Sequence, residues 1–172
     1  MCYYTSCNNA NGGKTLMAEK KTVFLTGASG HMGWAGFKEL YKKKDKLNIV
    51  LLLRDSEKNR KKFANYLNDP SVKIVWGDLK KYDDVLKCVE GSDYVLHVGG
   101  MVSPSADYYP TKTIQTNTTA AKNIVDAVKA QPNKDDIKVV YIGTVAQTGD
   151  RNAPIHWART GDPIKILSLI HI

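Results

Sequence analysis

The chain alternates short apolar runs with longer segments whose apolar residues recur at helical spacing. Five runs rich in β-branched and aliphatic side chains predict strands, at residues 22–26, 48–54, 72–76, 94–98 and 137–142. Four segments with apolar residues every three or four positions predict helices, at residues 32–44, 56–67, 82–89 and 111–130. Residues 99–110 are rich in Gly, Ser and Pro and are expected to form a loop. Strict alternation of strand and helix predicts an α/β protein with a doubly wound parallel sheet, cut short after its fifth strand.

The two ends of the chain differ from the middle. Residues 1–16 have no acidic residue and no apolar periodicity, and Met17 opens an ordinary charged lead into the first strand. We interpret residues 1–16 as upstream sequence or a disordered extension. The last six residues, LSLIHI, equal the translation of a common sequencing-library adapter end, CTGTCTCTTATACACATCT. We interpret residues 167–172 as an artefactual tail, with a short apolar strand as the alternative, which leaves 17–166 as one domain.

Composition narrows the class of protein. The 172 residues are 42% hydrophobic, which suffices for one domain with a core. The net charge of +8 gathers at residues 42–46 and 58–62, both inside predicted helices. Solvated helix faces are therefore expected there, in preference to a nucleic-acid surface. No apolar run is long enough to span a bilayer, and the three Cys lack metal-type spacing, so neither a membrane span nor a metal site is expected. Cys88 alone in 17–166 suits a cytoplasmic protein.

The segment TGASGHMG, residues 26–33, is the sharpest chemical signal. It follows the first predicted strand directly and opens the first predicted helix. Glycines at these positions permit a tight turn and let backbone N–H groups approach a pyrophosphate at the positive end of the helix dipole. A glycine-rich turn without a ligand is the alternative. The candidate nucleotide-binding residues of this segment are Gly27, Ser29, Gly30, His31, Met32 and Gly33.

The end of the second predicted strand bears on the kind of nucleotide. A group that contacts the adenosine ribose is expected about 20 residues beyond the glycines. Arg54 stands there, and its guanidinium can pair with a 2′-phosphate, aided by Lys58 or Arg60. The next residue, Asp55, could instead accept a hydrogen bond from a 2′-hydroxyl. The pattern favours NADP(H), with NAD(H) as the alternative.

Five motifs in order resemble the extended short-chain dehydrogenases/reductases, a family that includes NAD-dependent epimerases, dehydratases and dihydroflavonol-reductase-like ketone reductases. The motifs lie between residues 21 and 149 and read TGASGHMG, LLLRDSEK, GDL, HVGG and NTTAAKNIVDAV. The resemblance implies a Rossmann-like NAD(P)-binding domain over residues 17–166. It also implies hydride transfer between nicotinamide and a small carbonyl, alcohol or nucleotide-sugar substrate, and it makes a homodimer possible in the full-length protein.

The resemblance assigns cofactor contacts beyond the glycine segment, to Asp78, Leu79, His97, Val98, Gly99 and Asn117. Taken without the family, Asp78 could simply cap a turn. His97 could be a hydrogen-bonded core histidine, and Asn117 could be an ordinary residue on a helix surface.

The catalytic residues implied by the resemblance are incomplete in this sequence. Thr144 takes the position of the catalytic hydroxyl after the fifth strand, although a Thr there could also satisfy local backbone groups. The family's Tyr-x-x-x-Lys pair is expected near residue 169, yet no Tyr follows Tyr141. Tyr108 and Lys112 match the spacing literally, but Pro110 lies between them, where a helix can only begin. We therefore expect a chain that binds cofactor without turnover, with a non-catalytic NAD(P)-binding sensor or scaffold as the alternative.

Overall fold

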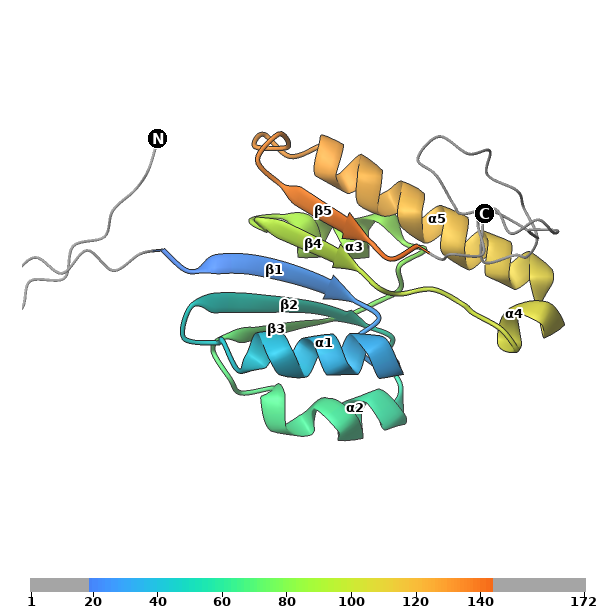
Figure 1. The fold of residues 1–172 in the computed structure, drawn as a ribbon, viewed down its shortest axis with the longest axis horizontal. Helices are drawn as coiled ribbons and strands as arrows, with labels where there is room; N and C mark the ends of the chain where they lie inside the picture. Colours follow the sequence, from blue (N-terminus) through green and yellow to red (C-terminus); the bar gives the residue numbers. More distant parts are fainter. Residues whose placement is uncertain (1–18, 144–172) are drawn as a thin grey trace, which may run out of the picture.

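The computed structural model describes residues 19–143, and its framework is one five-stranded sheet. The strands are β1 (Lys21–Thr26), β2 (Leu47–Leu53), β3 (Val72–Trp76), β4 (Tyr94–His97) and β5 (Lys138–Tyr141). Their order across the sheet is β3-β2-β1-β4-β5, and every neighbouring pair is parallel (Figure 1). This arrangement confirms the predicted Rossmann-like α/β fold.

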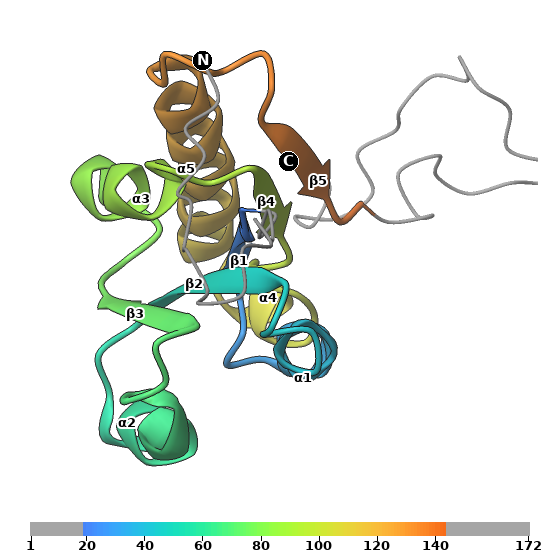
Figure 2. The ribbon, with the colours of Figure 1, turned by 90° about the vertical axis from the view of Figure 1, so that its left-hand side faces the viewer.

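Helices cover both faces of the sheet. The helices α1 (His31–Tyr41) and α2 (Glu57–Phe63) lie on one face, and α3 (Tyr82–Val89) and α5 (Pro110–Lys129) lie on the other (Figures 1 and 2). Successive strand residues point to opposite faces, so Phe24 joins the core beneath α3 and α5 while Leu25 joins the core beneath α1 and α2. Residues 49–53 of β2 are all buried, as the apolar run predicted.

A cluster of five aromatic rings packs α1 against the end of α2. Three rings come from α1, one from the last residue of α2 and one from the turn after it: Trp34, Phe37, Tyr41, Phe63 and Tyr66. Phe37 and Phe63 have no exposed surface, and the Phe37 and Tyr66 ring centroids lie 4.8 Å apart in an edge-on contact. Edge-on pairs of this kind stabilise beyond the area they bury, because the ring edge is positive and the face negative. The cluster therefore holds α1, from Trp34 to its last residue Tyr41, against α2 and the residues that follow α2.

One predicted boundary was wrong. The helix predicted at residues 32–44 ends at Tyr41, and residues 42–46 form turns, so this Lys-rich cluster is not a helix face. A tertiary contact accompanies this end. Asp69 accepts hydrogen bonds from the Tyr41 hydroxyl at 2.7 Å and from Lys44 Nζ at 2.9 Å, which ties the turn after α1 to the segment before β3.

Two further segments differ from prediction in detail. The helix predicted at residues 56–67 is split into α2 and a 3-10 turn, η1 (Ala64–Tyr66). The loop predicted at residues 99–110 contains a short helix, α4 (Ser105–Tyr108). Tyr108 thus ends α4 while Lys112 lies in the first turn of α5, so the two belong to different helices.

Candidate functional site

The glycine segment lies where the strand order reverses, between β1 and β4, at the carboxyl ends of the strands. Gly27 has φ of +73°, and a Cβ there would lie 2.7 Å from both the Cα and the nitrogen of Gly99. A Cβ on Gly33 would lie only 2.1 Å from the carbonyl oxygen of Gly27. Both positions therefore require glycine: the first for a left-handed turn beside another backbone, the second for the packing of α1 on that turn.

The start of α1 suits an anion. Gly30 is the residue that precedes the helix, and no side chain caps the helix or places an acid in its first turn. The first N–H groups of a helix have no partner within it and carry the positive end of its dipole. His31 and Met32 are exposed in this turn, and Ser29 is half-buried just before it. The arrangement can therefore hold a phosphate or pyrophosphate on backbone donors.

Thr26, which no sequence argument selected, joins β1 to the end of β4. Its hydroxyl oxygen accepts hydrogen bonds from the N–H groups of Val98 at 3.1 Å and Gly99 at 2.9 Å. The same oxygen lies 2.8 Å from Nδ1 of His97. Because the oxygen already accepts twice, we assign its proton to the bond with Nδ1, which leaves the imidazole neutral with its proton on Nε2.

His97 is 5% exposed, and burial lowers its pKa to about 4. The imidazole is therefore uncharged at neutral pH and acts as a hydrogen-bond acceptor for Thr26. This matches the alternative of a hydrogen-bonded core histidine, with a consequence for the site: Val98 and Gly99 owe their backbone positions to the Thr26 hydroxyl that His97 orients.

Asn117 anchors the loop that follows β4. Its side chain accepts from the N–H of Met101 at 2.8 Å and donates to the carbonyl of Met101 at 3.1 Å. Asn117 is thus more than an ordinary helix-surface residue, because this two-point contact ties α5 to the loop. Leu79 packs close to Gly99, since a Cβ on Gly99 would lie 3.1 Å from Leu79 Cδ1. Asn117 and Leu79 thus both contact the segment that follows β4, next to the glycine segment.

Asp78 behaves as a turn residue in this structure. Its Oδ1 accepts a hydrogen bond from the N–H of Lys80 at 2.9 Å, and its own N–H donates to Asp84 at 3.1 Å. A cofactor contact at Asp78 stays a prediction. Thr144, the predicted catalytic hydroxyl, lies outside the described residues.

The residues that follow β2 include several basic side chains, and the first carboxylate among them, Asp55, is paired with Arg60. Asp55 accepts two hydrogen bonds from Arg60, at 2.6 Å and 2.8 Å, and this contact lowers the pKa of Asp55. Arg60 also lies over the Trp76 ring, 5.0 Å from its centroid. Arg54 and Lys58 are exposed and have no carboxylate partner among residues 19–143. The side chains available here to a ligand are therefore Arg54 and Lys58, while Asp55 and Arg60 satisfy each other.

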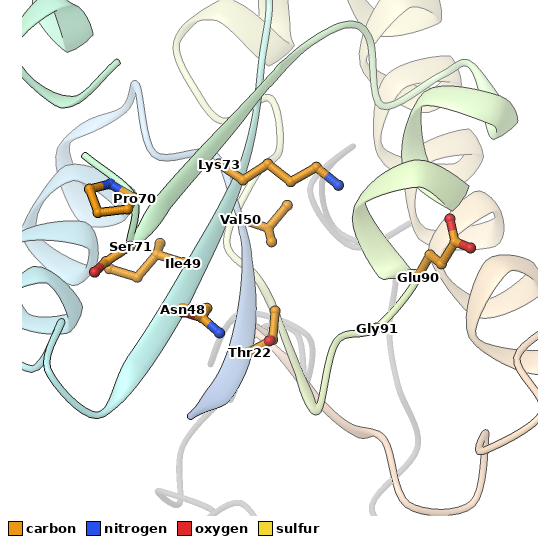
Figure 3. A pocket seen from close by; sticks show the side chains of 9 residues that line it. All are labelled: Thr22, Asn48, Ile49, Val50, Pro70, Ser71, Lys73, Glu90 and Gly91. Atoms are coloured by element: carbon orange, nitrogen blue, oxygen red, sulfur yellow. The ribbon is translucent and has the colours of Figure 1, made fainter. Parts of the chain in front are cut away.

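A hollow lies at the opposite end of the sheet from the glycine segment. Its volume is about 330 Å³, and its lining includes Thr22, Asn48 and Ser71 at the amino ends of β1, β2 and β3 (Figure 3). Lys73 and Glu90 add charges of opposite sign. Ligands of open parallel sheets bind at the carboxyl ends of the strands, so this hollow is separate from the candidate site.

Two other classes of site are missing from the described part of the chain. Residues 19–143 contain no group of three His, Cys, Asp or Glu side chains that could hold a metal ion. In the same range, no helix combines the length and the apolar character that a membrane crossing demands.

Comparison with known proteins places this geometry in a family. The family model described as "NAD dependent epimerase/dehydratase family" matches residues 23–166. A UDP-glucose 4-epimerase of Rickettsia bellii (strain RML369-C) is 33% identical over 128 residues, which is 72% of this chain and 36% of the relative. The chain thus spans about a third of the length of such curated relatives.

Solved structures show the same fold at lower identity. DesIV, the dTDP-glucose 4,6-dehydratase of Streptomyces venezuelae, matches with a TM-score of 0.71 at 18% identity, over 87% of this chain and 47% of that one. The UDP-Glc/GlcNAc 4-epimerase of Campylobacter jejuni matches with a TM-score of 0.70 at 16% identity, over 88% of this chain and 45% of that one. With its family motifs on the described fold, the chain belongs to the NAD dependent epimerase/dehydratase family.

Proposed function

We propose that this chain is the cofactor-binding part of an oxidoreductase that moves hydride between a nicotinamide dinucleotide and a carbonyl or alcohol carbon of a small molecule. The observation that carries the proposal is the contact of Gly27 with Gly99, which brings two backbones together beside the uncapped start of α1. The relatives named for UDP-glucose and dTDP-glucose support a nucleotide sugar as the substrate class. A cytoplasmic location and a homodimer remain predictions.

The residues present fit a dinucleotide. Gly27 and Gly33 permit the tight turn and the close packing of α1 on it, and Gly30 adds no side chain at the helix start, where backbone N–H groups could meet a pyrophosphate. The bound dinucleotide would supply the hydride donor or acceptor, and the described residues bind and orient it. Thr26 and Asn117 hold the backbone on the β4 side of the site in place, so this backbone is ordered before a ligand binds.

We further propose that NADP(H) is preferred to NAD(H). The ribose 2′-hydroxyl of NAD(H) calls for an acceptor carboxylate, and the two oxygens of Asp55 already accept from Arg60. A 2′-phosphate calls for cations, which Arg54 and Lys58 offer. NAD(H) is the alternative, because the structurally similar DesIV was solved with NAD bound.

Calorimetric titration of the 172-residue chain with NADPH and with NADH tests both statements. We expect saturable binding of NADPH and weaker binding of NADH. Failure of both to bind would reject the cofactor role, whereas equal affinities would reject only the preference.

Arg54→Asp is expected to weaken NADPH binding by about ten- to a hundred-fold and to leave NADH binding nearly unchanged. The substitution removes a charged donor and adds an anion next to the 2′-phosphate. Lys46→Asp is the matched control, because it makes the same change of charge at an exposed position before the other end of β2. Titrations of both variants provide the measurement, and an unchanged ratio of NADPH to NADH affinity in Arg54→Asp would contradict the assignment.

For catalysis, we propose that Thr144 hydrogen-bonds the substrate oxygen. We also propose that this chain alone does not convert substrate, because no Tyr follows Tyr141 in it. The same observation favours a second candidate, a cofactor-binding sensor or scaffold without catalysis. Oxidation of NADPH in the presence of a panel of aldehydes, ketones and nucleotide sugars tests inactivity directly. Measurable turnover would reject both the inactivity of this chain and the sensor.

A further inference from the structure

The hollow at the amino ends of the strands has room for a small ligand. Its volume of about 330 Å³ is within the range of natural ligand pockets. The helix α3 ends at Val89, and the chain turns at Gly91 with φ of +72°. Because Glu90 and Gly91 both line the hollow, its border on the helix side is the end of α3 (Figure 3). The hollow therefore lies between this helix end and the strand starts.

The sheet contributes four side chains to the hollow from a single face. In the parallel register, Asn48 of β2 pairs with Thr22 of β1. Two residues further along β2, Val50 pairs with Lys73 of β3. Paired residues, and residues two apart on one strand, point to the same face of a sheet. This is the face that α3 and α5 cover, because Val50 belongs to the core beneath them. The hollow thus combines a buried apolar residue with half-buried Thr22 and Asn48 and an exposed cation.

The neutral polar side chains of the hollow have unused hydrogen-bonding groups. Thr22 and Ser71 donate hydrogen bonds from their backbone N–H groups, to Asp93 and Asp69. Within residues 19–143, no hydrogen bond uses the hydroxyls of these two residues or the side-chain amide of Asn48. Ser71 is only 9% exposed, and a hydroxyl at such depth ordinarily has a partner. The lining therefore offers donors and acceptors that the described residues do not satisfy.

Two opposite charges border the hollow without forming an ion pair. Figure 3 shows the Lys73 side chain extending from β3 toward the side of the hollow where Glu90 lies. The ion pairs formed within residues 19–143 include neither of these two side chains. Glu90 directly follows the last residue of α3, where the negative end of the helix dipole adds to its attraction for a cation. A ligand that carries both charges can therefore pair with each of them at once.

We propose that this hollow is a ligand site separate from the cofactor site, and that it binds a small zwitterion of the amino-acid class. The carboxylate of the ligand pairs with the Lys73 ammonium, its ammonium pairs with the Glu90 carboxylate, and its aliphatic part packs on Val50. A ligand with a single charge meets one attractive and one repulsive group. Both protein charges are exposed, so each contributes modestly and the dissociation constant should be about 1–10 mM.

The first test compares L-valine with two analogues that each lack one of its charges. Isovalerate keeps the carboxylate and the branched chain, and isobutylamine keeps the ammonium and the branched chain. NMR titration of the isotopically labelled full chain follows the amide signals of Asn48, Ser71 and Gly91. We expect saturable shifts with valine and binding of either analogue that is at least about ten-fold weaker. No saturable shift up to about 50 mM valine, or an analogue that binds as well as valine, would overturn the proposal.

Variants then assign the two charges. Lys73→Met and Glu90→Gln should each weaken valine binding by about ten-fold, and exchange of the two residues, Lys73→Glu with Glu90→Lys, should restore most of it. Lys87→Met is the matched control, because this exposed lysine in the last turn of α3 does not line the hollow. An equal loss in Lys87→Met would reduce the effect to net charge and overturn the assignment. The analogue comparison uses the unaltered chain, so it decides the proposal even where a variant does not fold.

Discussion

Gly33→Ala is expected to destabilise the protein by about 3 kcal/mol or more and to abolish nucleotide binding. The added Cβ would lie 2.1 Å from the carbonyl oxygen of Gly27, 2.4 Å from its carbonyl carbon and 2.8 Å from the nitrogen of Ala28. All three are backbone atoms, so no side-chain rotation relieves the clash. Either α1 moves away from the turn or the turn loses its left-handed residue, and both changes dismantle the proposed pyrophosphate site. Urea unfolding and NADPH titration measure the two effects.

Gly36→Ala is the control for this substitution. Gly36 lies one turn further along the same helix, and nothing lies within 4 Å of its added Cβ. Alanine there should stabilise the protein by about 0.5–1 kcal/mol, because glycine loses more backbone freedom inside a helix. If Gly33→Ala proved as stable as Gly36→Ala, the tight packing of α1 on the turn would be refuted.

Acid is expected to remove up to about 3 kcal/mol of stability through His97 alone as the pH falls from about 6.5 to about 4. The pKa of His97 is lowered from 6.5 to about 4 by burial. Between these values the unfolded chain binds a proton that the folded chain excludes, so protonation favours unfolding. The stabilisation is complete above pH 6.5 and declines toward pH 4. Urea unfolding at intervals across this range should show the loss.

His97→Asn separates this contribution from the carboxylates that titrate at lower pH. The variant is expected to be less stable at neutral pH, because Thr26 loses its partner, but its unfolding free energy should fall less steeply between pH 6.5 and 4. Identical slopes in wild type and His97→Asn would rule out His97 as the source.

The sequence predicted most of the fold because the signals that define it are local. The bounds of β3 and α3 were predicted to the residue, from a short apolar run and from helical spacing that ends at Gly91. The end of α1 was missed because the turn after it is held by Asp69, 25 positions beyond Lys44 in the sequence, and such a distant partner leaves no local signal. The short helix α4 was missed because a segment of Gly, Ser and Pro carries no periodicity.

In the candidate site, too, features marked by local sequence could be predicted, and contacts between distant residues could not. The glycine segment and Arg54 stand out in the sequence, since spacing and strand context mark them. The hydrogen bond from Lys62 Nζ to the carbonyl of Ser29 could not be predicted, because a lysine in a basic helix is expected to be exposed to solvent and Ser29 is 33 positions away. Thr26 could have been found, since a hydroxyl at the last residue of β1 stands next to the glycine turn. Its bonds to the end of β4 needed the structure.

The Thr26–Gly99 contact also determines when this part of the site can form during synthesis of the chain. Thr26 leaves the ribosome 73 residues before Gly99, the partner that completes its side of the cleft. At about 5–20 residues per second, the gap lasts roughly 4–15 seconds. During that interval β1, β2, β3 and their helices can associate, while only the β1 side of the proposed pyrophosphate site is present. If that site binds a dinucleotide as proposed, the ligand can stabilise the nascent protein only after β4 has joined the sheet.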